Sequence, residues 1–399
     1  MASTGAWRLD PSVVFLNHGS FGACPAPVLA AQDQWRERME REPVLFLGRE
    51  LEGLLETARV AVGAFIGADP DDLAFVPNAT TGVNTILRSL RFAPGDELLA
   101  GDHEYNATLN AMRAAAERDG ARLVVARIPF PLRDASEVIE AILAAVTART
   151  RLALVSEVTS PTGLVFPLAD MVRELDARGV DTIVDAAHAP GMIEQDVAAL
   201  GAAYWTATAH KWLCAPKGAA VLHVRRDRQA GIRPLVISHG ANDPRPGRSR
   251  FRLEFDWTGT TDPTAWLTLP AAIDFVGRLL PGGWPAVMAA NRALALAGRD
   301  LLSERLGIEP PAPDAMIGSM AALPLPVPPD DGAAAELQRV LFDEDRIEVP
   351  VLAWPVLAAR PPGTPAKATL VRISAQRYNT LDQVERLATA LVARLPAAR

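Results

Sequence analysis

The chain contains few cysteines and no long apolar run. Cys24 and Cys214 are its only cysteines in 399 residues, so a disulfide framework is not the basis of the fold. No run approaches the roughly 18 to 20 apolar residues of a membrane span. The N-terminus lacks the pattern of a secretory signal. No block of like charge occurs, and the net charge of −7 argues against nucleic acid or an anionic membrane as a partner. These absences predict a cytoplasmic protein.

Several catalytic motifs are missing as well. No Cys/His cluster has zinc spacing, so no metal site is expected. No Gly-x-Ser-x-Gly elbow of a hydrolase occurs. The stretch 215–218 lacks the glycine pattern of a nucleotide phosphate loop. Apolar residues nevertheless make up 49 % of the chain, enough for a large core. A globular enzyme with another kind of site is therefore expected.

Strand and helix signals alternate from about residue 73 to residue 224. Short apolar runs typical of buried strands lie at 73–76, 98–100, 123–126, 152–155, 182–184 and 219–222. Helical segments are expected at 80–90, 138–146 and 168–177. Near-continuous apolar strands separated by helices predict an α/β fold with a mostly parallel, doubly wound sheet.

The composition changes after Pro263, and prolines are frequent at 310–329 and 355–365. A β-type run is followed by a helix with a possible capping box formed by Thr380 and Gln383. We expect a smaller α+β domain in this part of the chain. The predicted organisation is an N-terminal segment at 1–34 that packs near the site, a large domain at 35–266 and a small domain at 267–399.

Lys211 and Asp185 are the most informative pair of residues. Lys211 follows His210 after a short apolar run, and Asp185 ends a strand-like segment. A lysine can hold pyridoxal phosphate as a Schiff base, and an acid can keep the pyridine nitrogen protonated. Alone, Lys211 could be an exposed loop lysine, and Asp185 could cap a helix. Together they predict a pyridoxal-phosphate site.

Other polar residues follow predicted strands, where ligands of parallel sheets bind. Those at strand ends are Thr80, Thr81, His103, Ser160, Asp185 and His188. Thr80 and Thr81 begin a helix whose N–H groups could bind an anion, although simple N-capping is the alternative. His188 could contact a ring oxygen of the cofactor or be a structural histidine. Thr208 and His210 could hold a phosphate or merely be polar residues at a strand end.

Two further predictions concern an aromatic ring and an arginine. His103 could stack on the cofactor, and Tyr105 is its rival within the same turn. Arg372 could bind a substrate carboxylate bidentately, or it could form a surface ion pair. In an extended strand it shares its face with Leu370 and Ser374, so an arginine there is costly unless it meets an anion.

Short motifs spread over the chain add a resemblance to a known family. They are Phe15–Gly22, Asn78–Gly82, Asp102–Tyr105, Thr159–Gly163, Asp185–His188, His210–Trp212 and Glu254–Thr260. In this combination the chain resembles the class V aminotransferase-like enzymes of fold type I, and within them the isopenicillin N epimerase-like group. The likeness runs almost from end to end. It is specific for the family, but it does not identify the substrate.

The resemblance implies a pyridoxal 5′-phosphate enzyme that forms a homodimer with its sites at the interface. The implied catalytic residues are Lys211, Asp185 and His103. The implied cofactor-binding residues are Thr80, Thr81, His103, Ser160, Asp185, His188, Thr208, His210, Lys211 and Thr260. Of these, Thr260 would reach the phosphate of the other subunit. The implied substrate-binding residues are Asn17, His18, Tyr105 and Arg372.

The expected reaction removes the Cα proton of a small-molecule amino-acid substrate, with Lys211 as the base. Epimerisation is the first expectation, and β-elimination from a cysteine-derived substrate is the alternative. A third alternative is a non-catalytic cofactor-binding protein. Related cysteine desulfurases carry a mobile-loop cysteine shortly before the arginine, but the stretch 349–367 has none. This difference argues against a persulfide-carrying desulfurase.

Overall fold

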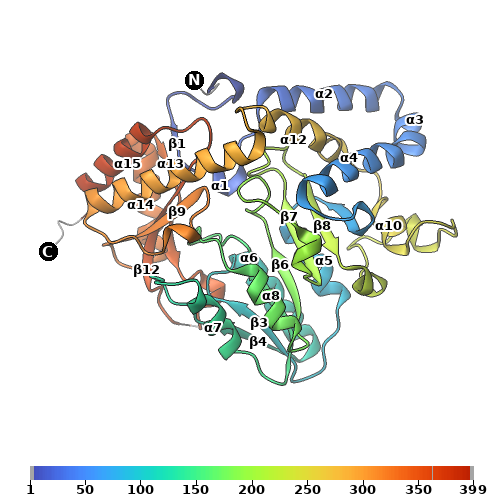
Figure 1. Cartoon of the computed structure of the whole chain (residues 1–399), viewed down its shortest axis with the longest axis horizontal. Helices are drawn as coiled ribbons and strands as arrows, with labels where there is room; N and C mark the ends of the chain where they lie inside the picture. Colours follow the sequence, from blue (N-terminus) through green and yellow to red (C-terminus); the bar gives the residue numbers. More distant parts are fainter. Residues whose placement is uncertain (1–3, 362, 396–399) are drawn as a thin grey trace.

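A seven-stranded sheet forms the centre of the computed structural model, which describes residues 4–361 and 363–395 (Figure 1). The strand order is β2-β8-β7-β6-β5-β3-β4. The strands are β2 (Leu73–Val76), β3 (Glu97–Gly101), β4 (Arg122–Ala126), β5 (Thr150–Ser156), β6 (Asp181–Asp185), β7 (Tyr204–Thr208) and β8 (Ala220–Val224). Strand β8 runs antiparallel to both of its neighbours, β2 and β7, and all other neighbouring strands of this sheet are parallel. The predicted α/β fold with a mostly parallel sheet is therefore confirmed.

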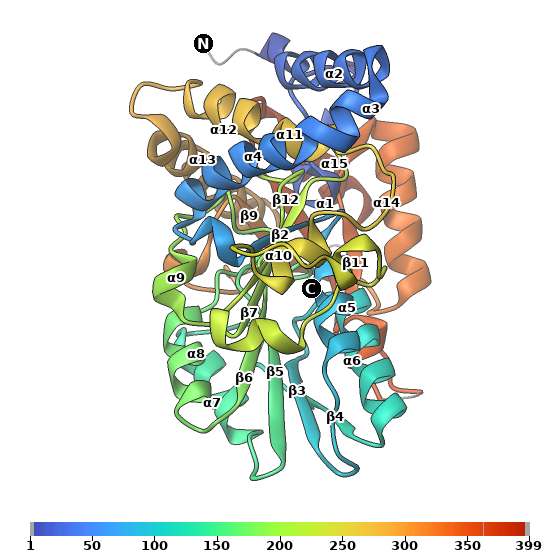
Figure 2. The ribbon, with the colours of Figure 1, turned by 90° about the vertical axis from the view of Figure 1, so that its right-hand side faces the viewer.

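Helices cover both faces of this sheet (Figure 2). Those beside it are α5 (Ala79–Ser89), α6 (Asn106–Asp119), α7 (Ser136–Ala144) and α8 (Leu168–Asp176). Successive residues of β3 point to opposite faces, as the pleat requires. Leu98 packs in one apolar cluster with residues of α5 and α6, whereas Leu99 packs in another with residues of α7 and α8. The sheet is thus buried on both sides, which explains why its strands are almost continuously apolar.

A second, antiparallel sheet lies in the C-terminal part of the chain. Its order is β11-β12-β9, with β9 (Met320–Leu325), β11 (Val351–Trp354) and β12 (Ala368–Ser374). The helices of this part are α13 (Gly283–Leu306), α14 (Asp331–Asp345) and α15 (Leu381–Arg394). The predicted capping box of Thr380 and Gln383 is present at the start of α15. Alternate residues of β12 enter the apolar cluster between this sheet and its helices.

The N-terminal segment joins the two parts. Strand β1 (Val14–Phe15) pairs in parallel with β10 (Ile347–Glu348). The remaining helices are α1 (His18–Phe21), α2 (Ala26–Arg41), α3 (Pro43–Leu45), α4 (Leu51–Ile66), α9 (Val197–Leu200), α10 (Arg250–Phe255), α11 (Thr264–Leu267) and α12 (Leu269–Gly277). Helix α2 runs through the predicted boundary after residue 34, and the other domain limits stay predictions. Among the described helices, none is both long and apolar enough to cross a membrane.

Candidate active site

A cavity of about 270 Å³ lies at the carboxyl ends of the parallel strands. This is the edge at which ligands of open α/β sheets bind. Many of the predicted residues line it, namely Thr80, Tyr105, Ser160, Asp185, His188, Thr208, His210 and Lys211. These residues come from turns that follow five different strands, so only the folded sheet brings them together.

Lys211 follows β7 and extends its amine into this cavity. Its Nζ lies 3.1 Å from Nε2 of His188. Burial, together with the charge of Arg372, lowers the pKa of Lys211 to about 8, and the charge of Asp185 opposes both effects. At pH 7 about one tenth of the amine is therefore neutral, far more than for an ordinary lysine. A neutral amine is the nucleophile that reacts with an aldehyde.

Asp185 ends β6 and is almost completely buried. One carboxylate oxygen accepts a hydrogen bond from the backbone N–H of Ala187, at 3.0 Å. Burial raises the pKa of this carboxyl, whereas the Ala187 N–H and the charge of Lys211 lower it. The carboxylate lines the cavity without an ion-pair partner among the described residues. A protonated ring nitrogen would supply the missing positive charge.

The backbone at Lys211 is held by close packing of the N-terminal segment. Gly22 has φ +68°, and a Cβ there would lie 2.0 Å from the carbonyl oxygen of His210. Only glycine tolerates both conditions. Nε2 of His18 lies 3.0 Å from the carbonyl oxygen of Lys211, to which it can only donate. The hydroxyl of Tyr378 lies 2.8 Å from Nδ1 of His18, so both ring nitrogens have partners.

The opposite end of the cavity is suited to an anion. Asn78 caps α5 by accepting a hydrogen bond from the backbone N–H of Thr81, at 2.8 Å. The hydroxyl of Thr208 accepts from the N–H of Ala79, at 3.3 Å. Nδ1 of His210 is buried without a partner among the described residues. The positive end of the α5 dipole and the unpartnered His210 nitrogen favour an anion here, so a phosphate fits this part of the cavity.

Arg372 lies beside the cavity as a buried cation. Its side chain comes from β12 and donates hydrogen bonds to the carbonyl oxygen of Ser160 and, at 3.3 Å, to the hydroxyl of Ser20. Nε is buried without a partner, and no carboxylate pairs with this guanidinium in the part of the chain described. Burial lowers its pKa to about 10. A buried guanidinium without an anion is costly, which fits a site for a substrate carboxylate.

His103, which was predicted to stack on the cofactor, is not among the residues that line the cavity. Its ring is fully buried between the two sheets, with ring centroids 4.9 Å from Trp354 and 5.7 Å from Phe166. Nδ1 lies 2.8 Å from the hydroxyl of Thr162. These contacts place the His103 ring behind the cavity lining, and its role stays a prediction. Tyr105, its rival in the same turn, lines the cavity and is 46 % exposed.

Two residues that were predicted to contact the substrate have other partners in the structure. Neither Asn17 nor His18 lines the cavity. The amide of Asn17 donates to the Glu348 carboxylate at 2.8 Å, which ties α1 to β10. His18 supports the Lys211 backbone instead of meeting a substrate.

Two predicted phosphate contacts lie elsewhere. Thr81 and Thr260 line a neighbouring cavity of about 430 Å³. Thr81 donates its hydroxyl to Asn78 at 3.0 Å, so the structure favours the alternative in which it belongs to the helix start. Because Thr260 was expected to act in the other subunit, its role stays a prediction.

Several residues at the site were missed by sequence reasoning. Ser20, Phe21 and Ser156 line the cavity. Glu104 lies behind Ser156, whose backbone N–H donates to it at 3.0 Å. Burial raises the pKa of Glu104 to about 8, and the nearby charge of Asp185 contributes. A polar residue at the end of an apolar strand was the available signal for Ser156. Glu104 lies within the Asp102–Tyr105 motif, but no role was predicted for it.

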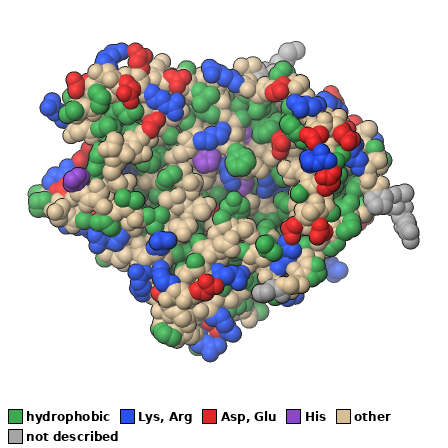
Figure 3. Space-filling view, turned by 180° about the vertical axis from the view of Figure 1, so that it is seen from behind, with side chains coloured by type: hydrophobic (Ala, Val, Ile, Leu, Met, Phe, Trp, Pro, Cys, Tyr) green, Lys and Arg blue, Asp and Glu red, His purple; other side chains and the backbone are tan. Residues whose placement is uncertain are grey.

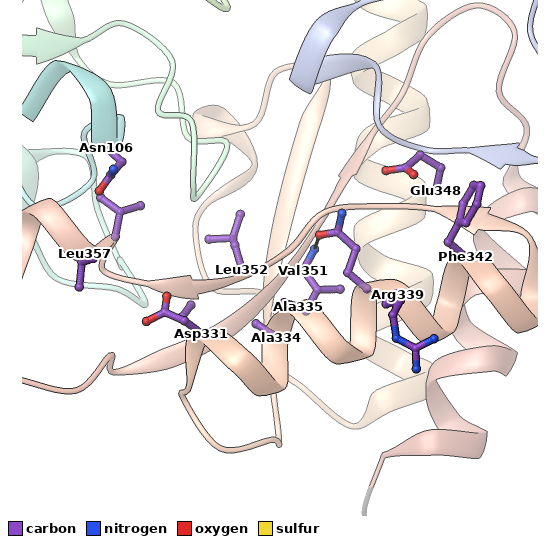
Figure 4. A pocket seen from close by; sticks show the side chains of 13 residues that line it. Asn106, Asp331, Ala334, Ala335, Arg339, Phe342, Glu348, Val351, Leu352 and Leu357 are labelled. Carbon is purple, nitrogen blue, oxygen red and sulfur yellow. Dashed lines mark hydrogen bonds between the residues drawn. The ribbon is translucent and has the colours of Figure 1, made fainter. Parts of the chain in front are cut away.

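A larger cavity, of about 560 Å³, lies between α14 and β11 (Figure 4). Its polar groups are engaged in structural contacts. Gln338 accepts from the N–H of Val351 at 3.1 Å, and Asn106 accepts from the N–H of Ala358 at 2.9 Å. Arg339 pairs with acidic residues of its own helix. The smaller cavity at Lys211 is therefore the better candidate for catalysis.

The residues around Lys211 fit pyridoxal phosphate. An enclosed amine, an unpaired buried carboxylate and a helix start with an unpartnered histidine nitrogen surround one cavity. They match the aldehyde, the pyridine nitrogen and the phosphate of that cofactor. The fold and the cavity together define a pyridoxal-phosphate-dependent enzyme.

Comparisons with known proteins agree with this class. The family model "Aminotransferase class-V" matches residues 22–387. Isopenicillin N epimerase of Amycolatopsis lactamdurans is 40% identical, over 96% of this chain and 95% of that protein. A probable chloroplastic L-cysteine desulfhydrase of Arabidopsis thaliana is 31% identical, over 96% and 83%.

A solved structure has the same fold. It is a mutant of C-DES with glycine covalently linked to its PLP cofactor, and it aligns with a TM-score of 0.80 at 20% identity. The alignment covers 99% of this chain and 100% of that chain. The predicted fold type I is therefore confirmed. The chain belongs to the class V aminotransferase family of pyridoxal-phosphate enzymes.

Proposed function

We propose that this enzyme epimerises an amino-acid substrate at Cα. When bound, pyridoxal phosphate draws electrons from the Cα of an attached amino acid and so acidifies its Cα–H bond. Nζ of Lys211 would first bind the cofactor and later receive the Cα proton on one face, and inversion is completed when a proton donor on the opposite face returns a proton to Cα. The observation that carries the proposal is the low proton affinity of this enclosed amine within reach of Asp185, in one cavity.

Each of the other residues has a proposed task in this cavity, except Arg372, which lies behind its lining residues Ser20 and Ser160. Asp185 holds the proton of the ring nitrogen, and Tyr105 lies beside the ring. The start of α5, with Thr80, Thr208 and His210, holds the phosphate. Arg372 binds the α-carboxylate of the substrate. A carboxylate fixed by a two-pronged hydrogen bond also fixes the direction of the Cα–H bond, which the proton transfer requires.

Solvent-deuterium exchange at Cα tests the reaction. The enzyme should exchange the Cα proton of its substrate and return both configurations. Borohydride reduction followed by peptide mapping should place the cofactor on Lys211. A label on Lys217 or Lys367, or no exchange with any amino acid of a broad panel, would contradict the proposal.

A C–S lyase is the second candidate. The chain is 31% identical to a desulfhydrase, which supports this candidate, but it is 40% identical to an epimerase, which is why epimerisation is proposed first. Both cysteines, Cys24 and Cys214, are buried, and burial raises the pKa of each thiol. They are poor carriers of a persulfide, so a lyase would release its thiol directly. Formation of pyruvate together with a free thiol would favour the lyase over the epimerase.

We also propose that the enzyme acts as a homodimer. Leu235, Val236 and Ile237 form an exposed apolar run, and Leu235 and Val236 line the same cavity as Thr260. Burial of this run against a second copy would bring Thr260 toward the partner's phosphate site. Ile237→Asp should weaken the dimer in sedimentation, whereas Val392→Asp, at an exposed position of α15, should not. A fully active wild-type monomer would contradict this proposal.

The substrate is proposed to be a small amino acid and not a polyanion. On the face shown in Figure 3, basic side chains lie among acidic ones, so this face has no single sign of charge. A nucleic-acid surface would instead show a basic stripe. The small cavity at Lys211 suits an amino acid attached to a cofactor. A cytoplasmic location remains part of the proposal.

A further inference from the structure

Trp212, the residue after the proposed Schiff-base lysine, contacts His188 from the side away from Lys211. Its indole N–H lies 3.3 Å from Nδ1 of His188. The other ring nitrogen of His188, Nε2, lies 3.1 Å from Nζ of Lys211. The three side chains therefore form a continuous chain of hydrogen bonds that ends at the reactive amine.

The direction of these hydrogen bonds follows from the chemistry of the groups. An indole N–H can only donate, so Nδ1 of His188 must accept and carries no proton. His188 is 2 % exposed, and burial holds its pKa well below the usual value, so the ring is neutral. A neutral imidazole has one N–H, which must then be on Nε2. Nε2–H can then donate to the lone pair of the neutral Lys211 amine, whereas an ammonium would find no acceptor at Nε2, so this arrangement favours the neutral amine.

The indole has little freedom to turn away. Trp212 is 1 % exposed, and its ring centroid lies 4.9 Å from that of His18. Gly191 has φ +89°, and a Cβ there would lie 2.5 Å from the carbonyl oxygen of Trp212. The backbone of the lysine loop is thus packed directly against the turn that carries His188. The N–H of Trp212 is fixed on Nδ1 by this packing on both sides.

We propose that Trp212 is a positioning residue that locks His188 in the tautomer with the proton on Nε2, so that His188 presents a donor to the cavity and favours the neutral amine of Lys211. This proposal depends on the proposed function in one respect, namely that Lys211 is the reactive amine. The tautomer itself follows from the contacts of Trp212 and His188.

Other charged groups also act on Lys211 and must be separated from this effect. Asp185 faces it from β6, and Arg372 faces it from β12. His210 precedes it in the chain, and His18 contacts its carbonyl oxygen from α1. Burial lowers the pKa of His210 to about 4 and that of His18 to about 3, so both rings are neutral near pH 7. A change confined to Trp212 leaves the side chains of all four groups present, and replacement by phenylalanine keeps an aromatic ring against His18.

Nitrogen NMR of the histidine-labelled holoenzyme tests the tautomer directly. The chain has 6 histidines, and loss of one signal set in His188→Gln assigns those of His188. We expect Nε2 protonated and Nδ1 unprotonated at every pH between about 6 and 9. Protonated Nδ1, or exchange between the two tautomers, would overturn the proposal. This measurement needs no variant of Trp212.

Trp212→Phe tests the effect on Lys211, because it keeps an aromatic ring and removes the N–H. His188 could then place its proton on Nδ1 and accept from a protonated amine. The pH midpoint of the cofactor absorbance should rise by about one unit, the scale of one buried hydrogen bond. Trp205→Phe is the matched control, since Trp205 is equally buried but donates to Glu157 at 3.3 Å. An unchanged midpoint, or equal shifts in both variants, would overturn the proposal.

A double variant distinguishes an effect through the orientation of His188 from a general loss of packing around Trp212. In a His188→Gln background, Trp212→Phe should leave the midpoint unchanged, because the ring that it orients is gone. A further rise there would overturn the role assigned to the tautomer. If Trp212→Phe does not fold, the NMR result on the wild-type protein decides. Absence of Cα exchange would instead refute the proposed function and leave the tautomer unaffected.

Discussion

Replacement of Arg372 by lysine separates hydrogen-bond geometry from charge at the proposed carboxylate site. The guanidinium already donates to the carbonyl oxygen of Ser160 and the hydroxyl of Ser20, and its Nε has no partner among the described residues. Nε and the remaining N–H groups are therefore available for a two-pronged contact with a substrate carboxylate. A lysine keeps the positive charge, but it presents its donors from a single atom.

The loss can be estimated from one missing charged hydrogen bond. Such a bond contributes about 1.5–3 kcal/mol, which corresponds to about 10- to 100-fold in kcat/KM. Because the charge stays, the pKa of Lys211 should change little in Arg372→Lys. In Arg372→Leu it should rise, since the charge of Arg372 lowers it in the wild-type protein. The two variants therefore distinguish substrate binding from the electrostatic effect on Lys211.

The assay is Cα–H exchange at several substrate concentrations, together with the pH titration of the cofactor absorbance. Arg299→Lys is the matched control, because Arg299 is another buried arginine that is already paired with Asp300 and Asp314 on α13 and its neighbouring loop. It should leave kcat/KM unchanged. If Arg372→Lys also leaves kcat/KM unchanged, another residue binds the carboxylate and the assignment fails.

The remaining predictions concern Lys211, Asp185 and the packing of the lysine loop. The folded-state pKa of Lys211, about 8, lies below its ordinary value of 10.5, so the unfolded chain binds more protons between these values. Lys211→Met should therefore raise the free energy of unfolding of the cofactor-free protein most below pH 8, and this gain should shrink toward pH 10.5. Denaturant unfolding measures it, and a gain that grows with pH would contradict this prediction. Asp185→Asn should leave the circular dichroism spectrum unchanged and lower the rate of Cα exchange by about 100-fold or more. A rate near that of the wild-type protein would mean that Asp185 serves only as a helix cap. Gly22→Ala should destabilise the protein by about 1–3 kcal/mol and impair cofactor binding. Gly95→Ala, which also has positive φ but has open space around it, should affect stability alone, and equal effects on cofactor binding would refute the packing argument.

Local patterns in the sequence were sufficient for the sheet and for its two central residues. Each buried strand is a short apolar run because both of its faces meet helices, and this property is visible in four or five consecutive residues. Lys211 and Asp185 stood out because each is a charged residue at the end of such a run. Parallel strands place their ends at one edge, so their meeting in one cavity could be expected.

Only the tertiary structure decided which neighbours of those residues reach the cavity. His103 and Tyr105 are two positions apart in one turn, and packing against Trp354 from the second sheet removes His103 from the site. Arg372 and His18 act through contacts with distant segments, at Ser160 and at the Lys211 backbone. Which side chains such long-range packing buries, and which it leaves without a partner, depends on the whole fold and leaves no local periodicity in the sequence. The sequence by itself thus determined the sheet and its reactive pair, whereas the orientation of the residues around that pair was decided by packing between the two sheets and the N-terminal segment.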